Sequence, residues 1–167
     1  AGRALGVALV AGVVLSLPSL MTARVADDIW HRAMLLHDRR WLPADSGPLA
    51  LYTFITGTPD EYARVVESGF APWWVSPSLR LCFFRPLSSL LLALDYKLWP
   101  DSTLLMHVHS IAWYAAVIAV AAKLYRRLLG SETSVARTAA GVATVFYAID
   151  YGHGLPVGWI ANRNAVV

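Results

Sequence analysis

Three long apolar runs divide the chain into candidate membrane spans and the segments between them. They cover about residues 4–21, 102–122 and 138–151. Crossing a bilayer takes about 20 mostly apolar residues, so the first two runs have the length of a span. The third run is short, and it crosses only if Arg137 reaches the interface and the helix extends toward His153. The pattern predicts an all-α, polytopic membrane protein with about three transmembrane helices.

Composition supports a membrane protein and argues against a soluble one. Hydrophobic residues make up 57% of the chain, charged residues only 15%, and the mean hydropathy is +0.50. These values lie outside the usual range of soluble domains. The formal net charge is a modest +3, with basic residues clustered between the second and third runs. That clustering predicts membrane topology, and no nucleic-acid site is expected.

Charge in the short connection sets the expected orientation. Residues 123–137 carry four basic side chains against one acidic side chain, so the positive-inside rule makes them a cytoplasmic loop. The amino terminus is then cytoplasmic as well. The long loop of residues 22–101 and the stretch after Asp150 are extracytoplasmic. The Ala, Arg and Val richness suits a bacterial inner (plasma) membrane.

The long loop has the sequence signals of short interfacial helices. Helical spacing of apolar residues predicts one from Asp27 to about Arg40. The sequence Thr58-Pro59-Asp60-Glu61 is typical of a capping box with Pro at the first helical position, which predicts a helix from Pro59 to Ser68. A third, from Pro86 to Trp99, is too short to span and is expected to lie along the surface.

Two further features concern the chain as a whole. Cys82 is the single cysteine, so no intrachain disulfide can form, and we expect a buried small apolar side chain there. The chain begins without Met and stops inside the apolar run 165–167. We therefore expect residues 1–167 to be the amino-terminal part of one membrane domain.

Several short motifs resemble one enzyme class. The acidic pair Asp27-Asp28 follows the first span, Phe84-Arg85-Pro86-Leu87 opens a surface helix, and His107 begins the second span. This order resembles the GT-C class of polytopic glycosyltransferases. The stretch from Ala148 to Asn164 is similar to the protein O-mannosyltransferase-like and TMTC-like branch of that class. The residues that carry this second similarity are His153, Pro156, Trp159-Ile160-Ala161 and Arg163-Asn164.

The resemblance implies transfer of a sugar, as by a hexosyltransferase, on the extracytoplasmic side. The donor would be a polyprenyl-phosphate-linked sugar, the acceptor a protein or glycan, and membrane lipids would surround the enzyme. Such chemistry needs a carboxylate that takes the proton of the attacking hydroxyl, and Asp27 or Asp28 is the candidate base. The phosphate leaving group needs positive charge, for which Arg85 and Arg163 are candidates.

Other polar residues are candidate substrate contacts. They are His107, His153, Trp159 and Asn164. His107 and His109 stand two apart, without the i, i+4 spacing of a helical metal pair, so no metal site is predicted from them. The residues indicate no certain cofactor, and whether transfer uses a divalent metal stays open.

Each assignment has a structural alternative. Acids are favoured at a helix start, so Asp27 or Asp28 equally suits a cap. Arg85 and Arg163 suit interfacial anchors that pair with lipid headgroups. The sequence is therefore also compatible with two other functions. One is a transporter or flippase subunit, whose charges line a polar path, and the other is a non-catalytic membrane scaffold. Replacing Asp28 by Asn should separate the three.

Overall fold

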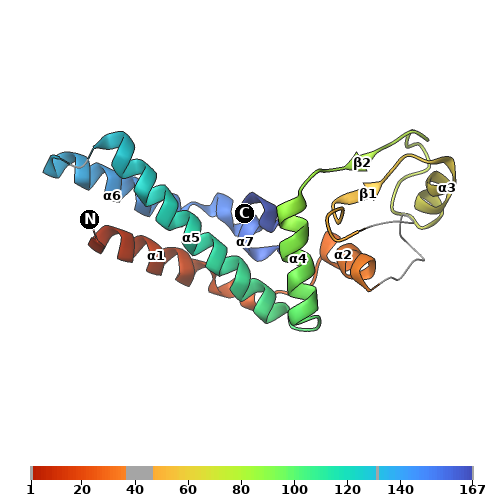
Figure 1. Ribbon diagram of the computed structural model, residues 1–167, viewed down its shortest axis with the longest axis horizontal. Coiled ribbons are helices and arrows are strands. Elements are labelled where there is room, and N and C mark those ends of the chain that lie inside the picture. Colours follow the sequence, from red (N-terminus) through yellow and green to blue (C-terminus); the bar gives the residue numbers. More distant parts are fainter. Residues whose placement is uncertain (1, 37–46, 131, 167) are drawn as a thin grey trace. The chain divides into compact units, whose positions relative to one another are not determined.

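The computed structural model describes residues 2–36, 47–130 and 132–166, and most of them are helical (Figure 1). The chain divides into two compact units. One comprises Ala1–Arg24 together with Ser102–Val167, and the other is Val25–Asp101. The second unit corresponds to the stretch that the sequence assigns to the long loop.

Three helices lie side by side in the first unit (Figure 1). They are α1 (Gly2–Ser16), α5 (Thr103–Leu129) and α6 (Ser134–Ile149). A short 3-10 helix, η1 (Leu17–Met21), continues α1. After α6 the chain turns through three short helices that pack against α5: η3 (Tyr151–His153), α7 (Gly154–Gly158) and η4 (Ile160–Ala165).

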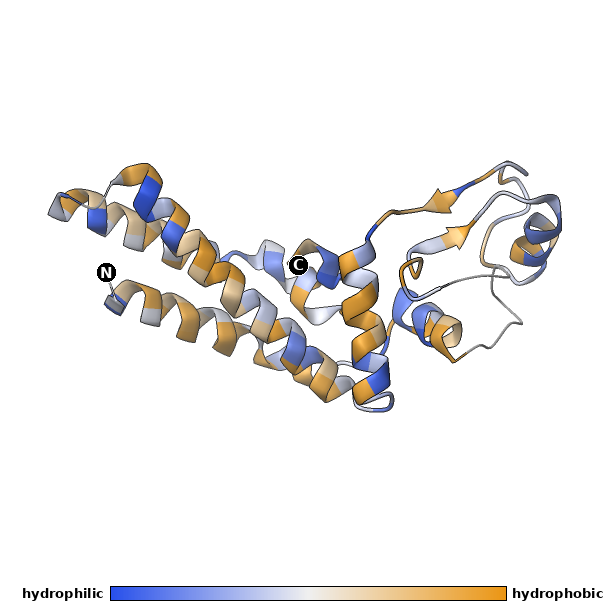
Figure 2. Ribbon diagram, viewed as in Figure 1, coloured by the Kyte–Doolittle hydropathy of each residue, from blue (hydrophilic) through white to orange (hydrophobic). Residues whose placement is uncertain are grey.

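Small residues hold α1 and α6 close together. Ala8 and Gly12 are buried on α1, and Ala140 and Ala148 are buried on α6. A Cβ atom added at Gly12 would lie 3.3 Å from the Ala148 carbonyl oxygen. Larger apolar side chains of both helices point outward instead, among them Val7, Val10, Val14, Val142 and Phe146. Small residues at the contact and large apolar residues outside are typical of helices packed in lipid. In Figure 2 the ribbons of α1 and α6 are coloured mostly as hydrophobic.

Two helical segments are long and apolar enough to cross a membrane. They are Gly2–Met21, with 20 residues, and Thr103–Leu129, with 27. The third predicted span corresponds to α6, which is apolar but has only 16 residues. A span of that length does not reach the usual ~30 Å of hydrocarbon, so the count of about three is not confirmed.

Helix α5 is longer than the sequence predicted. The expected span ended at residue 122, and residues 123–137 were expected to form a loop, yet α5 continues through Arg126 and Arg127 to Leu129. Basic side chains are good helix formers and are favoured in a last turn by the helix dipole. Gly130, with φ of +83°, ends the helix, and α6 begins at Ser134. The connection is therefore much shorter than expected.

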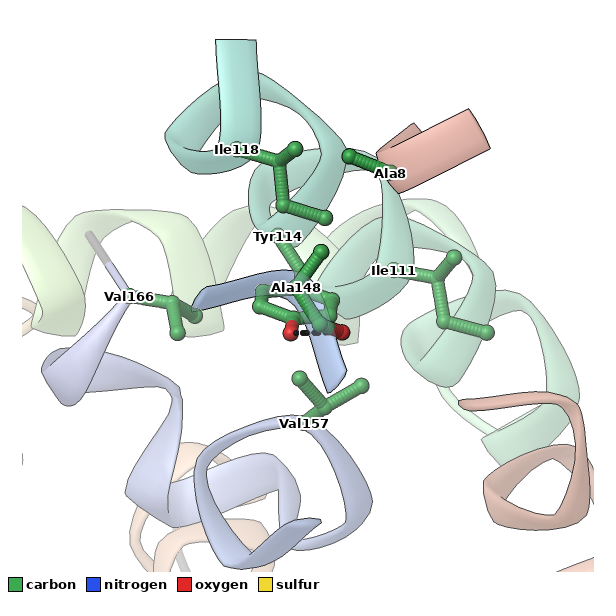
Figure 3. Packing of buried hydrophobic residues seen from close by; sticks show 7 residues of the cluster. All are labelled: Ala8, Ile111, Tyr114, Ile118, Ala148, Val157 and Val166. Carbon is green, nitrogen blue, oxygen red and sulfur yellow. Dashed lines mark hydrogen bonds between the residues drawn. The ribbon is translucent and has the colours of Figure 1, made fainter. Parts of the chain in front are cut away.

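The core of the first unit lies where the three helices meet the short helices after α6 (Figure 3). It contains Ala8, Ile111, Tyr114, Ile118, Ala148, Val157 and Val166. At its centre the Tyr114 hydroxyl donates a 2.9 Å hydrogen bond to the carbonyl of Ala148, near the end of α6. This bond satisfies one of the carbonyls that a helix end leaves without a partner.

The second unit mixes short helices with a two-stranded sheet. Its elements are α2 (Asp27–Leu35), β1 (Thr53–Ile55), α3 (Pro59–Glu67), β2 (Leu81–Cys82) and α4 (Pro86–Leu98). The strands pair antiparallel, with Thr53 opposite Cys82 and Ile55 opposite Leu81. The sequence predicted no strands. Runs of two and three residues are too short to show the alternation by which strands are recognised.

Cys82 is exposed, so the expected burial of this side chain is wrong. Its thiol donates to the carbonyl of Ile55 across the sheet, with a sulfur–oxygen distance of 3.1 Å. Cys82 lies in a two-stranded sheet, in which each strand has only one neighbouring strand. The described residues hold no second cysteine that could pair with it.

The predicted helix at Pro59 is confirmed to within one residue, but its cap differs. The Thr58 side chain makes no capping hydrogen bond. The buried Glu61 carboxylate instead accepts from the backbone N–H groups of Thr56, at 2.7 Å, and Gly57, at 3.1 Å. Helix α2 is shorter than predicted, since it ends at Leu35. The predicted end near Arg40 lies outside the described residues.

Helix α4 agrees with the prediction of a helix from Pro86. One stripe of the helix is apolar and exposed, formed by Leu87, Leu90, Leu94 and Leu98. The buried residues of the helix are Ser89, Leu92, Asp95 and Tyr96. Polar and apolar side chains are thus buried together, while an apolar stripe of leucines is exposed.

Candidate functional site

The acidic pair begins α2, directly after a strained residue. Ala26, the N-cap, has φ of +44°, a conformation that costs energy for a residue with a side chain. Asp28 is only 1% exposed, and its carboxylate accepts a 3.1 Å hydrogen bond from the N–H of Val25. Tyr96 of α4 donates a 3.0 Å hydrogen bond to the backbone carbonyl of Asp28. These contacts indicate that Asp28 stabilises the turn that begins α2.

Asp27 is the more accessible member of the pair. It is half-buried, and this burial raises the pKa of its carboxyl above the ordinary value, while the positive charge of Arg85 partly offsets the rise. A carboxylate with a raised pKa holds a proton more readily and is a better general base. The structure thus brings Asp27 into electrostatic reach of Arg85, another predicted site residue.

Arg85 lies between aromatic rings at the start of α4. Its guanidinium carbon is 5.2 Å from the centre of the Tyr52 ring and 5.0 Å from the centre of the Phe83 ring. Contacts of this kind attract a cation to the ring faces and hold the side chain in one orientation. The residue is the N-cap of α4, so the backbone and the two rings together restrict the position of the guanidinium.

A buried histidine near this pair was missed by the sequence analysis. His31 of α2 is 0% exposed, and its ring lies 4.8 Å from that of Tyr52 and 5.5 Å from that of Phe54. Burial lowers the pKa of His31 to about 4, despite an opposing interaction with the Leu51 backbone. Its spacing of three from Asp28 places both residues on one helical face, which was the available signal.

A second polar group lies in the first unit, at the beginning of α5. His107 is buried, and its Nε2 shares a 2.8 Å hydrogen bond with the hydroxyl of Thr22. The same hydroxyl lies 3.3 Å from the carbonyl oxygen of Gly158 in α7. His107 therefore ties the end of η1 to the segment that carries the Trp159–Asn164 motif.

Arg163 packs its guanidinium against α5. The residue is 3% exposed, its Nε donates to the Ser110 hydroxyl at 2.8 Å, and one terminal nitrogen donates to the Met106 carbonyl at 2.7 Å. These bonds fix η4 on α5 and direct the charge inward. The geometry favours a structural role for Arg163 over the predicted contact with donor phosphate.

His109 stands between two donors and can satisfy one of them at a time. Its Nδ1 lies 3.2 Å from a terminal nitrogen of Arg163, and its Nε2 lies 3.0 Å from the indole nitrogen of Trp113. Guanidinium and indole groups only donate, and a neutral imidazole has one nitrogen that accepts. The tautomer of His109 therefore decides whether its accepting nitrogen binds Arg163 or Trp113.

A cavity of about 460 Å³ lies between the end of α1, η1 and the short helices that follow α6. Its wall includes Thr22, Asp150 and His153, and apolar parts of α1 and α7 complete it. The His153 ring lies 4.9 Å from the Tyr114 ring and 4.6 Å from the Tyr147 ring. A polar rim over an apolar wall suits a ligand that has both kinds of surface.

Trp159 and Asn164, two predicted substrate contacts, carry buried polar atoms that are not hydrogen-bonded. The indole nitrogen of Trp159 and the side-chain oxygen of Asn164 are both inaccessible, and neither has a partner among the described residues. A buried polar group without a partner costs about 1–3 kcal/mol. Neither Trp159 nor Asn164 lines the cavity of about 460 Å³.

Comparison with protein-family models, curated proteins and solved structures found no match. The functional argument therefore rests on the residues of this chain.

The structure gathers the predicted site residues into two groups. Asp27, Asp28 and Arg85 belong to the second unit, and the predicted substrate contacts belong to the first, together with Arg163. Across the described ranges, no three His, Cys, Asp or Glu side chains gather as a metal site would need.

Proposed function

We propose that the chain is part of a GT-C-like membrane glycosyltransferase. It would move a sugar from a polyprenyl-phosphate donor to an extracytoplasmic protein or glycan acceptor. In this proposal α6 completes a third span, and the amino terminus is cytoplasmic, in a bacterial inner membrane. The resemblance described above suggests this class, and the geometry of the acidic turn refines the roles of its residues.

The observation that carries the proposal is that Asp27, a half-buried carboxyl with a raised pKa, lies within electrostatic reach of Arg85. The raised pKa of Asp27 suits the removal of a proton from an attacking hydroxyl. The Arg85 guanidinium, which contacts the rings of Tyr52 and Phe83, offers a planar fork that matches two phosphate oxygens. A base and a phosphate-binding cation are the two groups that this transfer requires.

The roles within the acidic pair follow from their contacts. Asp28 is buried and its carboxylate is used by the turn, so we assign it to holding the turn in place. Asp27 is assigned as the base. Trp159 and Asn164 keep the substrate-contact role that the resemblance implies, and Arg163 is assigned to positioning of η4.

The test is consumption of labelled polyprenyl-phosphate sugars by the full chain in membranes. We expect Asp27→Asn to lower turnover by ~100-fold or more, the usual effect of losing a general base. Arg85→Gln should also lower turnover, because the leaving phosphate loses its positive partner. Asp60→Asn, at an exposed position of α3, is the matched control and should leave turnover unchanged.

Two results would contradict the proposal. If Asp27→Asn matches an active wild type, Asp27 is not the base. If no donor from a broad panel of polyprenyl-phosphate sugars is consumed, the acidic turn is structural, and the transporter or scaffold function takes its place.

A further inference from the structure

A groove runs between α1 and α6 on the outer side of the first unit. Its volume is about 640 Å³. The apolar side chains that line it are Val7, Val142, Val145 and Phe146. Ala4 and Gly141 lie where the helices come closest, since a Cβ added at Gly141 would be 2.9 Å from that of Ala4. The groove therefore has an apolar wall formed by two closely packed helices.

Basic and hydroxyl side chains line the same groove, near the start of both helices. They are Arg3 of α1 and Ser134, Arg137 and Thr138 of α6. Arg137 also borders a smaller cleft with Arg126 of α5. Residues 123–137 add Lys123 and Arg127, and the acidic side chain there is Glu132. The groove thus joins an apolar wall to an end that carries two arginines, Arg3 and Arg137.

We propose that this groove binds an anionic phospholipid. The headgroup phosphate would lie between Arg3 and Arg137, which are both exposed, and an acyl chain would lie along the apolar wall. Guanidinium groups bind phosphate oxygens through charge-assisted hydrogen bonds, and basic pockets between membrane helices are known sites for acidic headgroups. This proposal does not depend on the transferase reaction.

The combination of charge and apolar wall selects a lipid over other occupants. Free phosphate would use the arginines but leave the wall exposed. An apolar helix would cover the wall but bring no negative charge to the basic end. A phospholipid with an acidic headgroup matches both parts at once, because Arg3 and Arg137 lie near the starts of α1 and α6, and helix ends are where a span meets the headgroup layer.

The test measures lipid binding to the full chain purified in a non-ionic detergent. Native mass spectrometry would follow titrations with phosphatidylglycerol and with phosphatidylcholine. We expect phosphatidylglycerol to bind at least ~10-fold more tightly. The variants Arg3→Gln and Arg137→Gln should each weaken phosphatidylglycerol binding by ~5-fold, since one basic residue at a membrane surface changes the affinity for an anionic lipid by about that factor.

The matched control is Arg127→Gln. It removes one positive charge from the same end of the unit, and Arg127 does not line the groove. Phosphatidylglycerol binding should be unchanged in this variant, and added inorganic phosphate should not displace the lipid. A third variant, Val142→Trp, should weaken binding by filling the apolar wall while both arginines remain.

Three outcomes would overturn the proposal. They are equal binding of the two lipids, displacement by inorganic phosphate alone, and loss of binding in Arg127→Gln as large as in Arg137→Gln. The last would show a general attraction of charges without a site. Circular dichroism of each variant checks that its helices are intact, so that a loss of lipid binding is not a loss of fold.

Discussion

The Tyr96 hydroxyl donates a 3.0 Å hydrogen bond to the backbone carbonyl of Asp28, and so ties α4 to the acidic turn. Both residues are buried. Tyr96→Phe would remove the donor and leave the carbonyl without this hydrogen bond, at a cost of ~1–3 kcal/mol in the free energy of unfolding. Thermal unfolding in detergent, followed by circular dichroism, measures this loss.

The matched control for that change is Tyr62→Phe. The Tyr62 hydroxyl donates to the Trp73 carbonyl at 3.3 Å, but in an exposed setting where water replaces it. We expect a clearly smaller effect there. Equal effects of the two variants would mean that the Tyr96 bond does not stabilise the turn.

Stability should depend on pH through His31. Its pKa in the folded chain is about 4, against an ordinary value of 6.5, so between these values the unfolded state binds a proton that the folded state does not. The stabilisation is complete above pH 6.5 and falls as the pH drops toward 4. At about 1.4 kcal/mol per pH unit the loss reaches about 3 kcal/mol. Melting temperatures between pH 7 and 4 measure it.

The comparison for His31 is His31→Phe, which keeps an aromatic ring beside Tyr52 and Phe54 but cannot take up a proton. This variant should lose less stability over the same pH range. If its pH profile were identical to that of the wild type, other groups would be responsible for the acid sensitivity.

Gly12 should tolerate no side chain, whereas Gly6 on the same helix should. A Cβ at Gly12 would lie 2.6 Å from Ile118 Cδ1, and one at Gly6 would meet nothing within 4 Å. Gly12→Ala should destabilise the first unit by ~1–3 kcal/mol, because overpacking moves Ile118 and separates the helices. Gly6→Ala should cause no loss, and thermal unfolding of both variants in one detergent compares them. A loss of equal size in Gly6→Ala would contradict the close approach at Gly12.

Replacing Ala26 by Gly should stabilise the protein. Strain at a positive φ costs ~1–3 kcal/mol for a residue with a Cβ, and the greater freedom of Gly when unfolded costs only ~0.5–1 kcal/mol. The net gain should therefore be ~1 kcal/mol. Ala63→Gly, at an exposed position within α3, should instead lose ~1 kcal/mol. A lower melting temperature for Ala26→Gly would show that the turn is not strained.

The sequence predicts helices well where local signals mark them. Pro59 and Pro86 begin helices as expected, because Pro fits the first helical turn. Other features depend on contacts distant in sequence. The pairing of Thr53 with Cys82, and the aromatic enclosure of His31, arise from packing that no local pattern encodes.

In the candidate site, too, local sequence signals predict some features, and others depend on contacts distant in sequence. The acidic pair is recognisable from its position after an apolar run, and the predicted loop of residues 22–101 contains both Asp27 and Arg85, but no local pattern predicts that their charges interact. The burial of Arg163 against α5 could not be predicted, because a lone arginine in a sequence looks the same whether it faces a phosphate or a helix. Partner atoms, which only the fold supplies, distinguish the two.

The exposure of Cys82 turns the question of orientation into a labelling experiment. It is the chain's single cysteine, and it lies on the strand that precedes Arg85. An exposed thiol is accessible to maleimides in solution. A membrane-impermeant maleimide added to intact cells should label the wild-type chain if residues 22–101 face outward, and only after lysis if they face the cytoplasm. The native protein thus contains its own marker of sidedness.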